Sequence, residues 1–271
     1  MNIGVFDSGL GGLTIFKELL KELPQYDYIY LGDNARVPYG GRSPAVIYEF
    51  TKQAVEFLLK KDCQLVILAC NTATTNALRR LQQKYLPANY PDRRVLGIVL
   101  PSVEAVTESN TRRVGIIATW ATVNSGSFIR EIKKINEDIE VLQQAGPLLV
   151  PFIEEGETSG PFLEAILRRY LTPLVDANID SLILGCTHYG LIKETVKKIA
   201  GPAIRVVSEG EVVAAKLKKY LARHWAIDKK LGKAGKRQYF VTDYSQRYHD
   251  LIELFLGDHF SAGQKLELAV I

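Results

Sequence analysis

The sequence predicts an α/β fold of two pseudo-symmetric, three-layer domains with mainly parallel sheets and a functional site in the cleft between them. Three observations predict it. Short apolar runs alternate with longer amphipathic patterns along almost all of the 271 residues, which is typical of parallel strands that crossover helices bury on both faces. Chains of this length often divide into two domains. An apolar run that ends in a cysteine also occurs once in each half of the chain.

The apolar runs are the predicted strands. They cover residues 3–6, 28–31, 65–69, 95–98, 114–118, 181–184, 206–207 and 239–241. Among the helices between them, the one at Pro44 has the clearest start, because Ser43 is a good N-cap and proline is favoured at the first helical position. Ile47, Phe50 and Ala54 then recur at three- and four-residue steps and predict a buried stripe. Further helices are expected over residues 72–84, 191–199 and 211–225.

The cysteine-ending runs indicate an internal repeat. LVILAC ends at Cys70 and SLILGC ends at Cys186, and each lies a similar distance after the first strand of its half. Two related α/β units would place these cysteines at equivalent points.

The repeat suggests where the domains divide. We expect a first domain of residues 1–98 plus 208–271, on the Cys70 side, and a second domain of residues 99–207, on the Cys186 side. The boundary is expected where residues 99–101 end a strand. The helix over residues 211–225 is expected to pack back on the first domain.

Unusual polar residues follow four of the predicted strands. These loops contain Asp7-Ser8-Gly9, Cys70-Asn71-Thr72, residues 119–124 and Cys186-Thr187-His188. Ligands of open parallel sheets bind beyond the carboxyl ends of the strands, so all four loops are expected to face one cleft.

Each of these two cysteines lies between a strand and a helix. The helix dipole and the unpaired N–H groups at a helix start favour a thiolate, so both thiols are predicted to have lowered pKa values. For a single cysteine, simple packing at a strand end would be the better interpretation. Two cysteines at equivalent points favour chemistry instead. Cys63 has no comparable polar neighbours, and we interpret it as a packing residue.

Two thiols on opposite sides of one cleft suit the inversion of a stereocentre. One thiolate removes a proton from one face while the partner thiol delivers a proton to the other face. A proton next to a carboxylate is less acidic than a thiol by on the order of ten pKa units, so preorganised donors must stabilise the transition state. The side chains of Ser8, Asn71, Thr72 and Thr187 are such donors, together with N–H groups at helix starts.

Asp7 and His188 lie beside this group. Asp7 either orients the Cys70 thiol, contacts a substrate ammonium or caps the helix after its glycine-rich turn. His188 is a proton partner for Cys186 or makes a structural hydrogen bond. In the loop of residues 32–41, the backbone amides of Tyr39 and Gly40 are candidates to hold a carboxylate, unless this is an ordinary glycine-rich turn.

Five motifs in order resemble the glutamate racemases over essentially the whole chain. They are IGVFDSGLGGLT near the start, GDNARVPYG, ACNTAT around Cys70, VPFIEEGE near Glu154 and GCTHY around Cys186. The resemblance implies a cofactor-free, usually dimeric enzyme that supplies D-glutamate for peptidoglycan synthesis.

The resemblance also assigns roles at the matching positions. Cys70 would act on D-glutamate and Cys186 on L-glutamate, with Asp7, Glu154 and His188 as supporting acid–base or orienting groups. The substrate would be held by Asp7, Ser8, Tyr39, Gly40, Asn71, Thr72, Thr187 and His188, with Thr119 or Thr122 as a further contact.

Composition argues against several other classes of protein. A net charge of +4 and one short basic stretch give no stripe for nucleic acid. No apolar run approaches the roughly 18 residues of a membrane span, and no leader is visible, so we expect a cytoplasmic protein without membrane partners. Three widely spaced cysteines form neither a disulfide framework nor a metal site.

Four alternatives remain open. An aspartate racemase of the same fold would use the same thiols. A pyridoxal-phosphate racemase needs a Schiff-base lysine, and the predicted cleft loops contain none. An amino-acid-binding module would hold glutamate without turnover. A thiol–disulfide oxidoreductase would need a Cys-x-x-Cys pair, which the sequence lacks.

Overall fold

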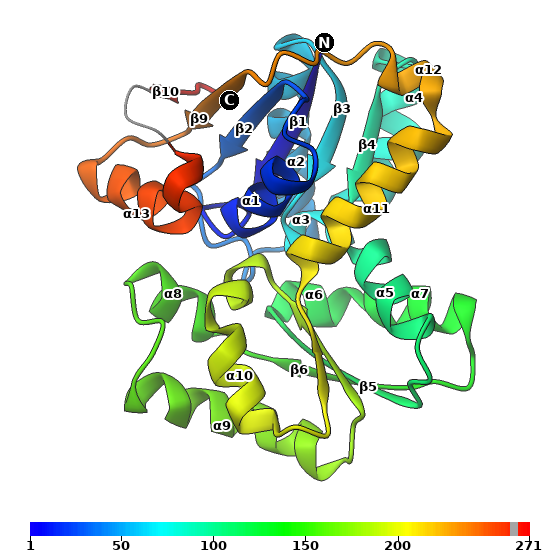
Figure 1. Ribbon diagram of the computed structural model, residues 1–271, viewed down its shortest axis with the longest axis vertical. Coiled ribbons are helices and arrows are strands. Elements are labelled where there is room, and N and C mark those ends of the chain that lie inside the picture. Colours follow the sequence, from blue (N-terminus) through cyan, green and yellow to red (C-terminus); the bar gives the residue numbers. More distant parts are fainter. Residues whose placement is uncertain (261–264) are drawn as a thin grey trace.

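The computed structural model describes residues 1–260 and 265–271, and it arranges them as two α/β lobes, one above the other in Figure 1. The upper lobe holds a six-stranded sheet and the lower lobe a four-stranded sheet. Every strand pair in the described residues is parallel. The predicted fold class, two α/β units with parallel sheets, is confirmed.

The strands alternate with helices in both sheets. The first sheet contains β1 (Asn2–Asp7), β2 (Tyr28–Gly32), β3 (Cys63–Leu68), β4 (Arg94–Gly97), β9 (Arg237–Val241) and β10 (Leu266–Leu268). The second contains β5 (Arg113–Ala118), β6 (Glu140–Ala145), β7 (Ser181–Gly185) and β8 (Arg205–Val207). The internal repeat appears in their order. Four neighbouring strands of the first sheet have the order β2-β1-β3-β4. The second sheet has the order β6-β5-β7-β8, which repeats that arrangement with the next four strands of the chain.

Helices cover both faces of the first sheet. One face packs on α1 (Leu13–Glu22), α11 (Glu209–Arg223) and α13 (Gln246–Leu256). The other packs on α2 (Pro44–Lys60), α3 (Asn71–Arg80), the π-helical turn η1 (Leu81–Tyr85) and α4 (Leu86–Asn89). Side chains of a strand point alternately to the two faces, so Val5 joins the first core and Phe6 the second. Each such fully buried side chain stabilises the fold by roughly 1.5–3 kcal/mol.

The second sheet is covered in the same way. One face packs on α8 (Leu149–Glu154), α9 (Pro161–Asp176), the 3₁₀ turn η2 (Thr187–Ile192) and α10 (Lys193–Ala200). The other packs on α5 (Val99–Thr107) and α7 (Ser127–Ile135), and α6 (Trp120–Ser125) packs against α3 of the first lobe. The short helices α12 (Trp225–Asp228) and η3 (Gly257–His259) complete the described structure.

The chain passes between the two sheets twice. The first passage joins β4 to α5, and the second joins β8 to α11. The second brings α11 onto α1, where Val213, Leu217 and Leu221 enter the core of the first sheet. The helix that we expected over residues 211–225 begins two residues earlier, at Glu209.

The start of α2 matches its prediction. Ser43 has the extended backbone of an N-cap and accepts a hydrogen bond from Val46 N at 3.4 Å, and Pro44 is the first helical residue. Ile47 and Ala54 lie in the buried stripe. The helix expected over 72–84 begins at Asn71 and passes from α-helix to π-helix after Arg80.

One sequence prediction is wrong, and two strands were not predicted. Residues 99–101 do not end a strand but form the first turn of α5, where a proline is tolerated because its missing N–H has no helical partner. The strand β6 was not expected, because it is a partly buried edge strand whose Gln143 and Gln144 interrupt the apolar pattern. The three-residue edge strand β10 was not expected either.

None of the helices in the described part of the chain has the length and apolar character of a membrane span.

Candidate active site

A cavity of about 180 Å³ is lined by residues that follow strands of both sheets. Ser8 follows β1 and Cys70 follows β3, while Thr119 follows β5 and Cys186 follows β7. The loops expected to face one cleft therefore do so. Of the predicted site residues, the cavity is lined by Ser8, Tyr39, Gly40, Cys70, Asn71, Thr72, Thr119, Cys186, Thr187 and His188.

A larger groove of about 800 Å³ lies elsewhere, lined by residues of α3, α5, α7 and α11. None of the three cysteines lines it. We place the chemistry in the smaller cavity, because both strand-end thiols are there.

Cys70 is the N-cap residue of α3. Its Sγ accepts a hydrogen bond from Ala73 N at 3.4 Å and lies 3.2 Å from Ser8 Oγ. Burial, followed by the charge of Asp7, raises the pKa of the Cys70 thiol to about 12 despite these two hydrogen bonds. The prediction that the helix start lowers the pKa of this thiol is therefore wrong, because loss of water outweighs the helix N-terminus. Cys70 is a neutral thiol at neutral pH.

Cys186 has a different neighbour. Its Sγ lies 3.8 Å from His188 Nδ1, and His188 Nε2 lies 3.0 Å from Glu154 Oε1. Burial opposes the charged imidazole, but the hydrogen bonds to Cys186 and Glu154 outweigh it and raise the pKa of His188 well above its usual value. A protonated His188 gives the Cys186 sulfur a positive partner.

The two thiols belong to one electrostatic site. They line the same cavity from different sheets, and a charge on Cys186 raises the pKa of Cys70. Cys63, by contrast, lies at the start of β3 with its sulfur packed beside Gly4 and does not line the cavity.

Asp7 of the first lobe is hydrogen-bonded to a residue of the second lobe. It is fully buried and accepts hydrogen bonds from Gly9 N at 2.8 Å and from Thr187 Oγ1 at 3.3 Å. Burial raises the pKa of Asp7, and the charge of His188 partly opposes this. The N-cap residue of α1 is Gly12, and its backbone N–H also hydrogen-bonds to the Asp7 carboxylate, so Asp7 contacts the start of that helix without being its N-cap residue. The hydrogen-bond partner of the Cys70 sulfur in the first loop is Ser8.

Three threonine hydroxyls meet on another wall of the cavity. Thr72 Oγ1 lies 2.9 Å from Thr119 Oγ1 and 3.4 Å from Thr122 Oγ1, and Thr119 donates to Thr122 at 3.1 Å. Thr72 belongs to the first lobe, whereas Thr119 and Thr122 belong to the second, so this cluster also spans the cleft.

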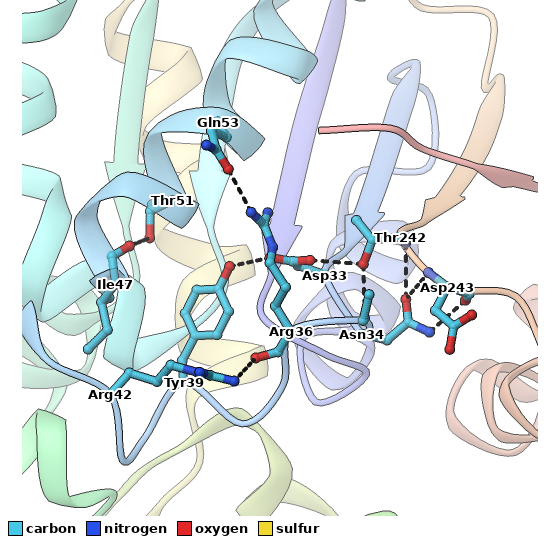
Figure 2. A network of polar contacts seen from close by, with 11 residues as sticks. Asp33, Asn34, Arg36, Tyr39, Arg42, Ile47, Thr51, Gln53, Thr242 and Asp243 are labelled. Carbon is cyan, nitrogen blue, oxygen red and sulfur yellow. Dashed lines mark hydrogen bonds and ion pairs between the residues drawn. The ribbon is translucent and has the colours of Figure 1, made fainter. Parts of the chain in front are cut away.

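The loop after β2 is tied down by a buried carboxylate, as Figure 2 shows. Asp33 accepts hydrogen bonds from the Tyr39 hydroxyl, from Arg36 Nε at 2.7 Å and from Thr242 Oγ1 at 2.8 Å. The Tyr39 ring therefore points at Asp33, and Tyr39 and Gly40 both line the cavity. A Cβ added at Gly40 would lie 2.8 Å from Thr119 Cβ, so only glycine allows this close approach.

Sequence reasoning missed several supporting residues. Glu209 accepts hydrogen bonds from Asn71 and Ser102, and burial raises its pKa to about 8. Asp33 directly follows β2, and Glu209 lies two residues after the end of β8, so the rule that selected Asp7 and Cys70 also applies to them. Gly146 and Pro147 line the cavity after β6 and were missed because that strand was not recognised.

The sequence matches a known family. The family model described as Asp/Glu/Hydantoin racemase matches residues 3–217. A glutamate racemase of Geobacter metallireducens is 40% identical over 258 residues, which cover 94% of this chain and 92% of that protein. A glutamate racemase of Persephonella marina is 39% identical over 272 residues, covering 100% and 99%.

Solved structures give the same picture. The crystal structure of Francisella tularensis glutamate racemase in complex with D-glutamate is similar with a TM-score of 0.88 and 37% identity, and covers 99% of this chain and 97% of that chain. Picrophilus torridus aspartate racemase is similar with a TM-score of 0.54 and 18% identity, covering 82% and 95%, and this likeness concerns the fold alone.

Proposed function

Because the chain belongs to the Asp/Glu/hydantoin racemase family, we propose that it is a glutamate racemase that interconverts L-glutamate and D-glutamate with two cysteines and no cofactor. Glutamate is favoured because the glutamate racemases match almost the whole chain, whereas the aspartate racemase has only 18% identity. The observation that carries the mechanism is that Cys70 and Cys186, from different sheets, line one small cavity with different partners.

The different partners suggest a starting state. Cys70 is a thiol because its pKa is raised to about 12, and protonated His188 lies beside the Cys186 sulfur, so Cys186 is the base that we assign to L-glutamate. With L-glutamate, Cys186 takes the α-proton and becomes a thiol, and the electron pair moves into the substrate carboxylate. Cys70 then gives its proton to the opposite face of the α-carbon and becomes a thiolate. D-glutamate reacts by the same steps in reverse.

The substrate charges must be held while this happens. We assign the substrate ammonium and α-carboxylate to Ser8, Asn71, Thr72 and Thr187, with Thr119 or Thr122 as a further contact, and the side-chain carboxylate to the amides of Tyr39 and Gly40. Preorganised donors of this kind stabilise the developing charge without reorganising. Asp7, Glu154 and His188 act as orienting or acid–base groups, with Asp7 beside Thr187 and Glu154 beside His188.

We further propose the biological setting that the family implies. The enzyme supplies D-glutamate for peptidoglycan and acts in the cytoplasm, where its three free thiols stay reduced. It forms a homodimer, which sedimentation of the purified protein tests. Its domains are residues 1–98 plus 208–271 and residues 99–207, a division supported by the strands that each sheet contains.

A racemization assay with both amino acids, without added cofactor, tests the substrate. We expect kcat/KM for glutamate to exceed that for aspartate at least tenfold, because one methylene in a pocket changes selectivity about 10–200-fold. Faster turnover of aspartate would make the chain an aspartate racemase. Binding of glutamate without exchange of its α-proton in deuterated water would make it a binding module. A bound chromophore with pyridoxal absorbance would indicate a cofactor enzyme.

A further inference from the structure

A buried carboxylate connects both interlobe passages of the chain to the catalytic cavity. Glu209 is the first residue of α11, at the end of the second passage, and only 3% of its surface is exposed. Its Oε1 accepts a hydrogen bond at 3.2 Å from Ser102 Oγ, which lies in α5 just after the first passage. Its Oε2 accepts a hydrogen bond at 2.5 Å from Asn71 Nδ2, at the start of the Cys70 helix.

Only one of the two polar atoms of the Asn71 side-chain amide has a hydrogen-bond partner among the described residues. Its Nδ2 is held by Glu209, while Oδ1 is buried and has no hydrogen-bond partner among the described residues. Glu209 accepts a hydrogen bond at each of its two oxygens, so it holds the NH₂ group of Asn71 on its side and turns the carbonyl oxygen away. Buried acceptors are rarely left unpaired, which suggests that a donor completes this site.

The substrate supplies a suitable donor. Asn71 lines the cavity next to Cys70, and the α-ammonium of an amino acid carries three N–H donors. Fixing the amide orientation in advance reduces the ordering cost of binding. A rotated amide would present N–H groups to the ammonium and repel it.

We propose that Glu209 is a positioning residue that fixes the Asn71 amide so that its carbonyl oxygen receives the substrate ammonium, and that Ser102 couples this orientation to the interlobe passages. The inference rests on the proposed racemase function. Glu209 lies behind Asn71 and touches neither substrate nor thiol in this scheme, so its loss weakens substrate binding more than it slows chemistry.

Two conservative variants of Glu209 separate the length of its side chain from its carboxyl group. Glu209→Gln keeps the length of the side chain, and its amide oxygen still accepts from Asn71 while its NH₂ group donates to Ser102. Glu209→Asp keeps the carboxyl group but withdraws it by one methylene. We expect KM for both glutamate enantiomers to stay within threefold for Glu209→Gln and to rise at least tenfold for Glu209→Asp, with kcat changing less than threefold in each. Glu211→Gln is the matched control, because Glu211 lies in the same first turn but is exposed.

A double variant shows whether the effect passes through Asn71. In an Asn71→Ala background, Glu209→Asp should raise KM less than twofold further. The reverse order of the single variants, with Asp near normal and Gln impaired, would overturn the inference, as would fully additive effects in the double variant. Absence of glutamate racemization by the wild-type protein would instead refute the proposed function, and the role of Glu209 with it.

Discussion

Cys70 and Cys186 have different hydrogen-bond partners, so the two thiols lie in different electrostatic surroundings. Burial and the charge of Asp7 raise the pKa of Cys70 to about 12, although Ser8 and the Ala73 amide hydrogen-bond to its sulfur. Cys186 faces His188, whose pKa is raised by its bonds to Cys186 and Glu154. The proposed two-base mechanism needs one thiolate and one thiol at the start of each turnover, and the different neighbours of the two sulfurs distinguish them.

Glu209 should make folding stability depend on pH. Burial raises its pKa from 4.5 to about 8, so the folded state holds a proton that the unfolded state has lost between these values. The free energy of unfolding therefore falls as pH rises from 4.5 through 8, by on the order of a few kcal/mol. Urea unfolding at about pH 5 and about pH 9 should show a smaller fall for Glu209→Gln than for wild type. Equal falls would place the pKa of Glu209 near its ordinary value.

At the scale of single elements, the clearest sequence signals were local. Ser43-Pro44 marked the start of α2, and uniformly apolar runs marked the strands that are buried on both faces. The strand β6 was not predicted because an edge strand needs no apolar residue at every position. The start of α5 was interpreted as the end of a strand because the sequence Val99-Leu100-Pro101 is also typical of a strand end.

The site residues, like the elements, were predictable only where a local sequence pattern marks them. Cys70, Asn71 and Cys186 directly follow strands, and that position made them predictable. Glu154 lies on α8, away from a strand end, and only the family resemblance selected it. The bond from Asn71 to Glu209 joins residues far apart in the chain, so no local pattern could show it.

The loop after β2 should depend on its buried anchor. Tyr39→Phe removes the hydroxyl that donates to Asp33, at a cost of about 1 kcal/mol. We expect KM for glutamate to rise about fivefold, because the Tyr39 and Gly40 amides lose their fixed position, while kcat changes little. Tyr244→Phe, at an exposed tyrosine, serves as the control in the same steady-state assay. An unchanged KM for Tyr39→Phe would show that the anchor does not position the loop.

At the scale of the whole molecule, the active site exists only where the two lobes meet. Asp7 of the first lobe accepts a hydrogen bond from Thr187 of the second, and Thr72 meets Thr119 across the same cleft. The equal strand order of the two sheets places one cysteine at the same point of each unit. Two equivalent α/β units therefore each bring one cysteine to the shared cavity.

A substitution at Gly11 tests how closely the two lobes must approach each other. A Cβ at Gly11 would lie 2.3 Å from His188 Nδ1 and 2.6 Å from Thr187 Oγ1, so Gly11→Ala must push His188 from its place beside Cys186. We expect kcat/KM to fall about 100-fold or more in both directions, the size of a lost acid–base contribution. Gly190→Ala is the control, since its nearest neighbour would lie at 3.6 Å. Equal activity of both variants would show that the spacing at Gly11 is not needed.

The most direct test of the two-thiol mechanism is the exchange of the substrate α-proton in deuterated water by Cys70→Ser and Cys186→Ser, with Cys63→Ala as a control that keeps both reacting thiols. Both serine variants should lose racemization. Cys70→Ser should still incorporate deuterium into L-glutamate without inversion, because Cys186 removes the α-proton, exchanges it with the solvent and returns a deuteron to the same face. Cys186→Ser should do the same only with D-glutamate. Racemization that persists in either serine variant, or exchange of the same enantiomer by both, would contradict a reaction carried by two opposed cysteines.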